Sequence, residues 1–570
     1  MVFSPPAYNN RNKQMKRRNL IKGLALLPIA GGAISRESLF AASKGSGASL
    51  SLATPLVETG EIITESSFMA ETNIFRSIGV EPIINCRGAY TIIGGSLELP
   101  PVREAMEAAS QNFVQYDELA EGIGQRLADL TGSEWGMVSA GCAAGMKHVT
   151  AACVTGGSPE KLIRIPNLTG FQKNEVIIPL YSRNTYDHSI RNIGVTIIHV
   201  ETPEELERAI NPKTAMIYVN AVNGSFTGQP FSLEVIAGIA KPKHVPVLID
   251  AAAENLTIPS VHLKRGADVV AYSGGKAMRG PQCAGLLLGN KEILMSAWQA
   301  SSPHHGPGRD NKVGREEMIG MMAAVETWIK RDHDAEYKSW LNRLDIIAKK
   351  ALTIQGVTTN VTNPAELSNK HPTLWISWDP AKLHISGYEV AEEISSTKPR
   401  VAIGSRDESN GNTTIDIVSS HMKEGEDIIV ANRIFEILSR KHIQKSDSMT
   451  APAANLTGKW DLNVRYFNSS VKHTFTIQQD GNWINGTHKG DFDMRDISGT
   501  IEGNQIKLSS VLKLPGDQIT FYFSGTASGD KLTGDIHMGE YRTAKFTASK
   551  STEKPVRKKV FVPNGPPLAT

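Results

Sequence analysis

The strongest constraint on this chain of 570 residues is a regular alternation of strand and helix patterns between residues 72 and 440. Short, nearly continuous apolar runs predict strands that are buried on both faces, as in parallel sheets. Stretches with helical spacing of apolar residues separate these runs, as in Leu119–Leu130. The alternation predicts an α/β fold with a largely parallel sheet. The predicted strands are Val195–Val200, Thr214–Asn220, Val245–Asp250, Asp268–Ser273 and Ala284–Gly289.

A different pattern begins after a polar stretch at 443–454, which predicts a linker. Apolar side chains then alternate with period two, and turn pairs such as Asp480–Gly481 separate the runs, so 455–550 is predicted to be an antiparallel all-β module. Leu456–Trp460 resembles the opening of lipocalin-like barrels. A barrel of about eight strands has an interior filled by side chains or holds one small ligand, and both remain open. All predicted catalytic residues precede 440, so we expect the module to be separable from the chemistry.

The first 44 residues resemble an export signal. Arg17 and Arg18 precede an apolar run, Gly23–Ile34, that is too short to span a bilayer core. The paired arginines resemble a Tat signal, which predicts periplasmic export by the Tat machinery, or membrane anchoring if the signal is not cleaved. A basic disordered tail is the alternative. Residues 45–71 are rich in Ser, Gly, Thr and Ala and predict a linker, and 551–570 is a predicted tail.

Charge and cysteine content exclude some classes of protein. The formal net charge of +3 is small for this length and does not indicate a nucleic-acid partner. None of the 4 cysteines has paired CxxC spacing, so we expect free thiols and no metal site.

Lys276 is the first candidate for chemistry. It follows a predicted strand in the run Tyr272–Lys276, where two glycines allow a sharp turn and close approach of a planar ligand. Desolvation of a lysine at the end of a buried strand lowers its pKa and makes it a nucleophile. The competing interpretation is a surface lysine in a loop.

Asp250 is the second candidate, because it closes an apolar strand where a carboxylate needs a cationic partner or a hydrogen-bonded site. It precedes Lys276 by about one strand–helix–strand unit, so both side chains can reach the carboxyl edge of the sheet. An aspartate that caps the next helix is the alternative. The third candidate is the small-residue run Ser139–Gly145, whose backbone N–H groups could hold a phosphate at a helix start.

Several separated motifs together resemble one protein family. They are Tyr272–Lys276, Arg279–Gln282 with Gly285, Ile84–Gly88 and Gly94–Ser96. Over residues 72–440 they resemble the selenocysteine synthase (L-seryl-tRNA selenium transferase) superfamily, and within it the D-glucosaminate-6-phosphate ammonia-lyase branch. The resemblance implies the fold-type I architecture of pyridoxal 5′-phosphate (PLP) enzymes, which is aspartate aminotransferase-like. It also implies a PLP domain at 72–345, a small α/β domain at 346–442, and a homodimer or higher oligomer.

The same resemblance implies roles for individual residues. Lys276 would form a Schiff base with PLP, and Asp250 would pair with the pyridine nitrogen. His188 would stack on the ring, with a purely structural histidine as the alternative. The implied phosphate-binding residues are Ala140, Gly141, Cys142, Ala143 and Ser273. The implied substrate contacts are Asn85, Arg279 and Arg400.

The predicted function is a PLP-dependent lyase that releases ammonia from an amino or hydroxy-amino (sugar) acid. A selenium transferase and an aminotransferase are the alternatives among enzymes, and the small net charge and the export signal count against a tRNA substrate. From another class, a catalytically silent PLP-fold binding protein is possible. The presence of both Lys276 and Asp250 argues against it.

Overall fold

The computed structural model describes residues 73–444, 446, 448–552, 559 and 565. The predicted signal peptide and first linker lie outside the described residues, as does most of the predicted tail. The chain divides into two compact units, Met1–Val80 and Glu81–Thr570. In the first unit the structure describes one short helix, α3 (Ile74–Ser77), which the side chain of Asn73 caps. All other elements belong to the second unit.

A seven-stranded sheet forms the first core of the second unit, in the order β2-β8-β7-β6-β5-β3-β4. Strands β4, β3, β5, β6 and β7 are parallel, and β8 runs antiparallel to both β2 and β7. The prediction of a largely parallel sheet is therefore confirmed. The strands are β2 (Trp135–Ser139), β3 (Glu175–Pro179), β4 (Thr196–Val200), β5 (Thr214–Asn220), β6 (Val247–Asp250), β7 (Val269–Ser273) and β8 (Gly285–Gly289).

Helices cover this sheet, and local sequence explains where they begin. Helix α9 (Pro203–Ala209) starts at Pro203, a residue that suits the first helical position, and the Thr202 hydroxyl caps it by accepting a hydrogen bond from the Glu205 N–H. The other large helices around this sheet are α4 (Pro100–Ser110), α5 (Tyr116–Thr131), α6 (Cys142–Thr155), α10 (Leu233–Ala240), α12 (Lys291–Gln299) and α13 (Arg315–Lys330). The short ones are α7 (Pro159–Leu162), α8 (His188–Arg191) and α11 (Val261–Lys264). Among the described residues, no helix has the length and apolarity needed to span a bilayer.

A second core forms around a four-stranded antiparallel sheet in the order β12-β13-β10-β9. The strand nearest the start of this unit, β1 (Ile83–Asn85), pairs in parallel with β11 (Arg400–Ala402), and the adjacent Cys86 is buried in this second core. The domain boundaries at 345 and 442 stay a prediction. The remaining strands are β9 (Thr358–Thr362), β10 (Thr373–Trp378), β12 (Gly404–Asp407) and β13 (Thr413–Val418). The helices are α14 (His333–Ala351), α15 (Pro380–Leu383), α16 (Gly387–Ser396) and α17 (Glu426–Ser439).

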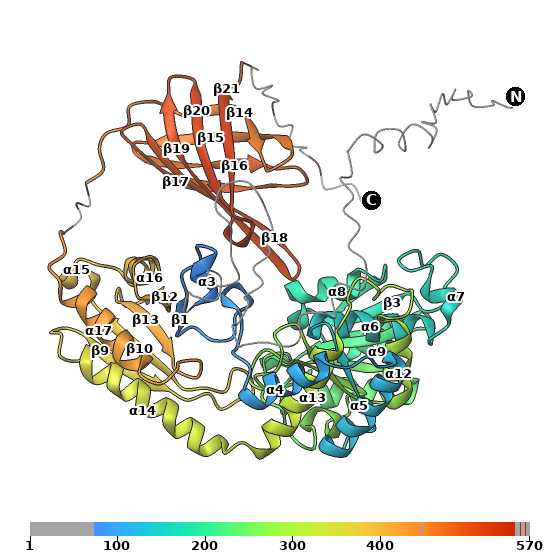
Figure 1. The fold of residues 1–570 in the computed structure, drawn as a ribbon. Helices are drawn as coiled ribbons and strands as arrows, with labels where there is room; N and C mark the ends of the chain where they lie inside the picture. The colour runs from blue at the N-terminus through green and yellow to red at the C-terminus, as the bar shows by residue number, and fades with distance from the viewer. Residues whose placement is uncertain (1–72, 445, 447, 553–558, 560–564, 566–570) are drawn as a thin grey trace, which may run out of the picture. The chain divides into compact units, whose positions relative to one another are not determined.

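The C-terminal module is a closed antiparallel barrel, orange to red in Figure 1. Apolar residues of the alternating pattern, such as Trp460, Phe475 and Phe523, are buried, and the rings of Phe475 and Phe523 lie 5.0 Å apart. The all-β prediction is therefore confirmed. Its strands are β14 (Gly458–Arg465), β15 (Ser470–Asp480), β16 (Trp483–Lys489), β17 (Met494–Glu502), β18 (Gln505–Leu514), β19 (Asp517–Ser528), β20 (Lys531–His537) and β21 (Thr543–Lys550).

Candidate active site

The two principal candidates meet at one edge of the seven-stranded sheet. Strands β6 and β7 are parallel neighbours, and Asp250 pairs in register with Ala271. The turn that carries Lys276 begins directly after β7, which ends at Ser273. Asp250 and Lys276 therefore lie at the same carboxyl edge, where open α/β sheets bind ligands.

Asp250 is held as a buried hydrogen-bond acceptor. Its side chain accepts from the Tyr218 hydroxyl at 3.0 Å through Oδ2, and from the Ala252 N–H at 3.0 Å through Oδ1. The Cys142 thiol lies 3.6 Å from Oδ1. Burial raises the pKa of Asp250, while these donors and the Lys276 ammonium oppose the rise. No described Lys, Arg or His forms an ion pair with Asp250, so the partners of this buried carboxylate are the hydrogen-bond donors named above.

The turn before Lys276 is so closely packed that only glycine fits. A Cβ on Gly275 would lie 2.7 Å from the Cα of Gln282, and one on Gly95 would overlap the Gln282 side chain. The Ser96 N–H donates to the Gly275 carbonyl at 3.1 Å. The sequence motifs around residues 95 and 275 therefore contact each other, although 180 residues separate them (275 − 95).

The predicted phosphate loop is brought to Asp250 by its position at the start of α6. Gly141 adopts a φ of 88° and precedes the helix, which leaves the first N–H groups without intrahelical partners. A Cβ on Gly285 of β8 would lie 2.5 Å from the Cys142 nitrogen, so the backbone of β8 packs directly against this loop. Ala140 and Ala143 are half-buried, and Ser273 lies opposite Gly285 in the β7–β8 ladder.

A cavity of about 490 Å³ opens beside Lys276. A second cavity of about 290 Å³ adjoins it, and the two share Ala89, Ala253, Lys276, Asn369 and His371. Lys276 therefore stands where both cavities meet. The volume suits a small metabolite rather than a polymer.

Cationic and imidazole side chains line the larger cavity. Arg279 has a φ of 54°, and its Nε donates to the Leu97 carbonyl at 2.8 Å. Burial and the neighbouring Arg331 lower the pKa of Arg279. Burial, with His371 and Arg279 nearby, lowers the pKa of His421 to about 4, so this imidazole is neutral at physiological pH. The cavity thus combines positive charge with neutral hydrogen-bonding groups.

Of the predicted site residues, only Lys276 and Arg279 line these two cavities. Asp250 and the predicted phosphate-binding residues are in neither lining, and three further candidates have other positions. His188 begins α8 with an exposed side chain. The Asn85 amide holds its own loop, since its oxygen accepts from the Arg87 and Gly88 N–H groups. Arg400 donates to the Ser395 and Glu81 carbonyls in the second core region. Of the predicted substrate contacts, Arg279 alone lies in the larger cavity.

Sequence reasoning missed several groups that the fold brings to the site. Tyr186, two residues before His188, lines the smaller cavity with Lys276. His371 belongs to a segment tied to the loop after β6, where the Asn369 N–H donates to the Ala253 carbonyl at 2.8 Å. Tyr218 lies inside β5, where it looks like an ordinary core aromatic. The capping residues around Tyr186 are the one local signal that could have revealed any of these groups.

Comparisons with known proteins agree with this geometry. Residues 182–309 match the aminotransferase class-V family. D-glucosaminate-6-phosphate ammonia lyase from Salmonella typhimurium is 30% identical over 51% of this chain and 78% of that protein. A 5′-C-glycyluridine monooxygenase-decarboxylase from a Streptomyces species is 27% identical over 58% and 84%. The L-seryl-tRNA(Sec) selenium transferase of Proteus mirabilis is 23% identical over 44% and 58%.

A solved structure of D-glucosaminate-6-phosphate ammonia-lyase superposes with a TM-score of 0.58. It is 25% identical and covers 65% of this chain and 99% of that one. The sequence relatives and the matching fold therefore indicate the same family. The chain is a PLP-dependent enzyme of the aminotransferase class-V fold and belongs to the family of D-glucosaminate-6-phosphate ammonia lyase.

Proposed function

We propose that this enzyme binds PLP between β6 and β7 and releases ammonia from a small amino or hydroxy-amino acid, including sugar acids. The observation that carries the proposal is the meeting of Lys276 and Asp250 at one sheet edge, beside a cavity of about 490 Å³. A primary amine and a buried carboxylate at one sheet edge suit a cofactor that has an aldehyde and a basic ring nitrogen.

The residues present fit PLP at its aldehyde, its ring nitrogen and its phosphate. Lys276 would hold the aldehyde carbon, and Asp250, with no described ion-pair partner of its own, would hold the protonated ring nitrogen. The N–H groups of Cys142 and Ala143 in the first turn of α6, with the Ser273 hydroxyl, would hold the phosphate, whereas the Gly141 N–H already donates to the Ser139 carbonyl at 2.9 Å. Tyr186 lines the smaller cavity, which His188 does not, and we propose Tyr186 in place of His188 as the aromatic neighbour of the ring.

The chain's own side chains then have defined tasks. PLP, when bound, supplies an electron sink for charge that develops on the substrate α-carbon. Lys276 takes the α-proton on its Nζ, because it is the amine where both cavities meet. Burial raises the pKa of Asp250, and the hydrogen bonds from Ala252 and Tyr218 oppose that rise because they stabilise the charged form.

Substrate binding would depend on the cationic side of the larger cavity. Arg279 and Lys370 both line it, and they suit a carboxylate or a second anionic group. The name of the Salmonella relative describes an amino-sugar acid that carries a phosphate. We therefore place acidic amino acids and phosphorylated amino-sugar acids first among candidate substrates.

Ammonia release from a panel of these compounds, with and without a keto acid, tests the proposal. A lyase releases ammonia without the keto acid, whereas an aminotransferase needs it as the amine acceptor. The Lys276→Ala variant is the control for background release. If no compound in the panel yields ammonia above this control, the lyase proposal fails.

The sequence also supports proposals about location and assembly. We infer export from Arg17 and Arg18, and a homodimer or higher oligomer from the fold-type I resemblance. Subcellular fractionation and light scattering test the two proposals.

A further inference from the structure

The turn that joins β18 and β19 in the barrel contacts the PLP domain. Leu514 pairs with Asp517, so Pro515 and Gly516 form a two-residue turn with a φ of 83° at the glycine. A proline followed by a glycine with positive φ is typical of a type II turn. The turn therefore has one defined backbone conformation, and its carbonyl groups are available as hydrogen-bond acceptors.

Contacts from this turn reach the segment that follows β3. The Pro515 carbonyl accepts from Arg183 at 2.9 Å, and Asp517 pairs with Arg191 at 3.0 Å. A Cβ on Gly516 would lie 2.9–3.1 Å from backbone atoms of Asn184. Gly516 therefore suits this contact for two reasons. Its φ is positive, and a side chain at this position would press against the backbone of Asn184.

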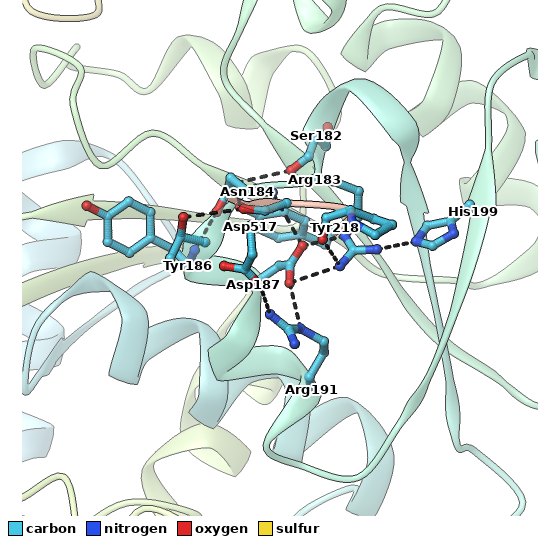
Figure 2. A network of polar contacts seen from close by, with 12 residues as sticks. Ser182, Arg183, Asn184, Tyr186, Asp187, Arg191, His199, Tyr218 and Asp517 are labelled. Carbon is cyan, nitrogen blue, oxygen red and sulfur yellow. Dashed lines mark hydrogen bonds and ion pairs between the residues drawn. The ribbon is translucent and has the colours of Figure 1, made fainter. Parts of the chain in front are cut away.

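Asp187 joins the two arginines into one unit (Figure 2). Its side chain is fully buried and pairs with both Arg183 and Arg191. Two carboxylates, Asp187 and Asp517, thus face two guanidinium groups, and loss of Asp517 leaves one positive charge in excess. Asp187 therefore ties the two ends of the segment Arg183–Arg191 together from within, and the turn contacts the same two arginines from the barrel.

This segment connects to Asp250 through two hydrogen bonds. The Asn184 amide nitrogen donates to the Tyr218 hydroxyl at 2.9 Å, and that hydroxyl donates to Asp250 at 3.0 Å. The Tyr186 N–H donates to the Asn184 side-chain oxygen at 2.8 Å, which fixes the orientation of the amide. Because the amide nitrogen can only donate, the one tyrosine proton must point at Asp250.

We propose that the Pro515–Asp517 turn of the barrel is a positioning element for Asp250, acting through Asn184 and Tyr218. The proposal rests on the proposed function, in which Asp250 holds the ring nitrogen of PLP. It gives the barrel a part in the active site without a residue that touches substrate. The expectation that the barrel is separable from the chemistry conflicts with these contacts.

A double-mutant cycle on PLP affinity tests the proposal. Asp517 and Tyr218 do not touch, so independent effects on the dissociation constant would multiply. We expect Asp517→Asn and Tyr218→Phe each to weaken PLP binding by about tenfold. The double variant should bind PLP no more weakly than whichever single variant binds it less tightly. The reason is that both changes interrupt the same chain of contacts from the turn to Asp250. A product of the two effects would overturn the proposal.

Two further measurements separate positioning from general damage. Hydrogen exchange of peptides spanning 183–191 in the full chain without PLP should be faster in Asp517→Asn. The matched control is Asp535→Asn, another barrel aspartate in an ion pair, here with Lys545 at 2.8 Å. The control should leave both exchange and PLP affinity unchanged. Unaltered exchange in Asp517→Asn would overturn the proposal, whereas a wild-type chain that binds no PLP would refute the proposed function instead.

Discussion

Replacement of Asp250 tests the assigned chemistry most directly. Asp250→Asn keeps the size of the side chain and removes its charge. One amide oxygen replaces two acceptor oxygens, so either the Tyr218 hydroxyl or the Ala252 N–H loses its partner. An unsatisfied buried donor costs about 1–3 kcal/mol. The variant no longer buries a charge, which offsets part of that cost, so we expect it to fold.

The Asp250→Asn substitution should reduce the turnover rate more than it reduces the stability of the fold. A neutral amide cannot form an ion pair with a protonated ring nitrogen. Loss of one partner of a buried charge pair costs about 2–5 kcal/mol in comparable interfaces. We expect turnover to fall at least about a hundredfold, which is about 2.7 kcal/mol at 1.36 kcal/mol for each factor of ten.

The assay is ammonia release, with PLP content and circular dichroism measured on the same sample. The matched control is Asp268→Asn, at the opposite end of the sheet. Asp268 is also a partly buried carboxylate that accepts a backbone N–H, from Val247 at 2.8 Å. The control should lose stability and keep turnover for each bound PLP. Near-wild-type turnover in Asp250→Asn would remove this residue from the mechanism.

Three other predictions concern attachment, pH and location. Borohydride should fix PLP covalently to Lys276 in the wild-type chain, and peptide mapping that finds the label on another lysine would refute the assignment. Burial lowers the pKa of His148 to about 3 from its ordinary 6.5, so the unfolded chain takes up this proton first as the pH falls. Stability is therefore lost below about pH 6.5, by about 1.4 kcal/mol at pH 5.5. The free energy of unfolding, measured with urea at pH 7.5 and at pH 5.5, should differ between the two pH values by that much less in His148→Gln than in the wild-type chain. An equal difference in the two proteins would contradict the reasoning. Lysine at both Arg17 and Arg18 should leave a folded enzyme in the cytoplasm, and normal export of this variant would exclude the Tat interpretation.

The sequence predicted the strands well because parallel strands buried on both faces are almost purely apolar. The prediction began β6 at Val245, whereas the strand begins at Val247. Pro246 has no N–H to donate to a ladder, which accounts for the later start. Asp250 and Lys276 could be predicted to lie together because they follow neighbouring strands of one parallel sheet.

The rest of the site depends on contacts that no local pattern shows. Asn184 and Asp187 form a capping box that begins a short helical turn, and Tyr186 within that turn lines the cavity while His188 is exposed. His371 reaches the cavity through backbone bonds between distant loops. At the tip of the barrel, the run Leu514–Asp517 looks like any hairpin turn. Nothing in these four residues indicates that their partners lie at 183–191.

The pairing of β1 with β11 has a consequence for how the chain is made. Residues 83 and 400 are register partners, so 317 further residues (400 − 83) must be synthesised before β1 can pair with β11. At about 5–20 residues per second, that wait lasts about 15–65 s. Cys86, whose thiol is fully buried once the second core closes, stays reactive on the nascent chain throughout this interval. The ribosome-bound chain should therefore be labelled at Cys86 by a thiol reagent that does not modify this cysteine in the finished enzyme.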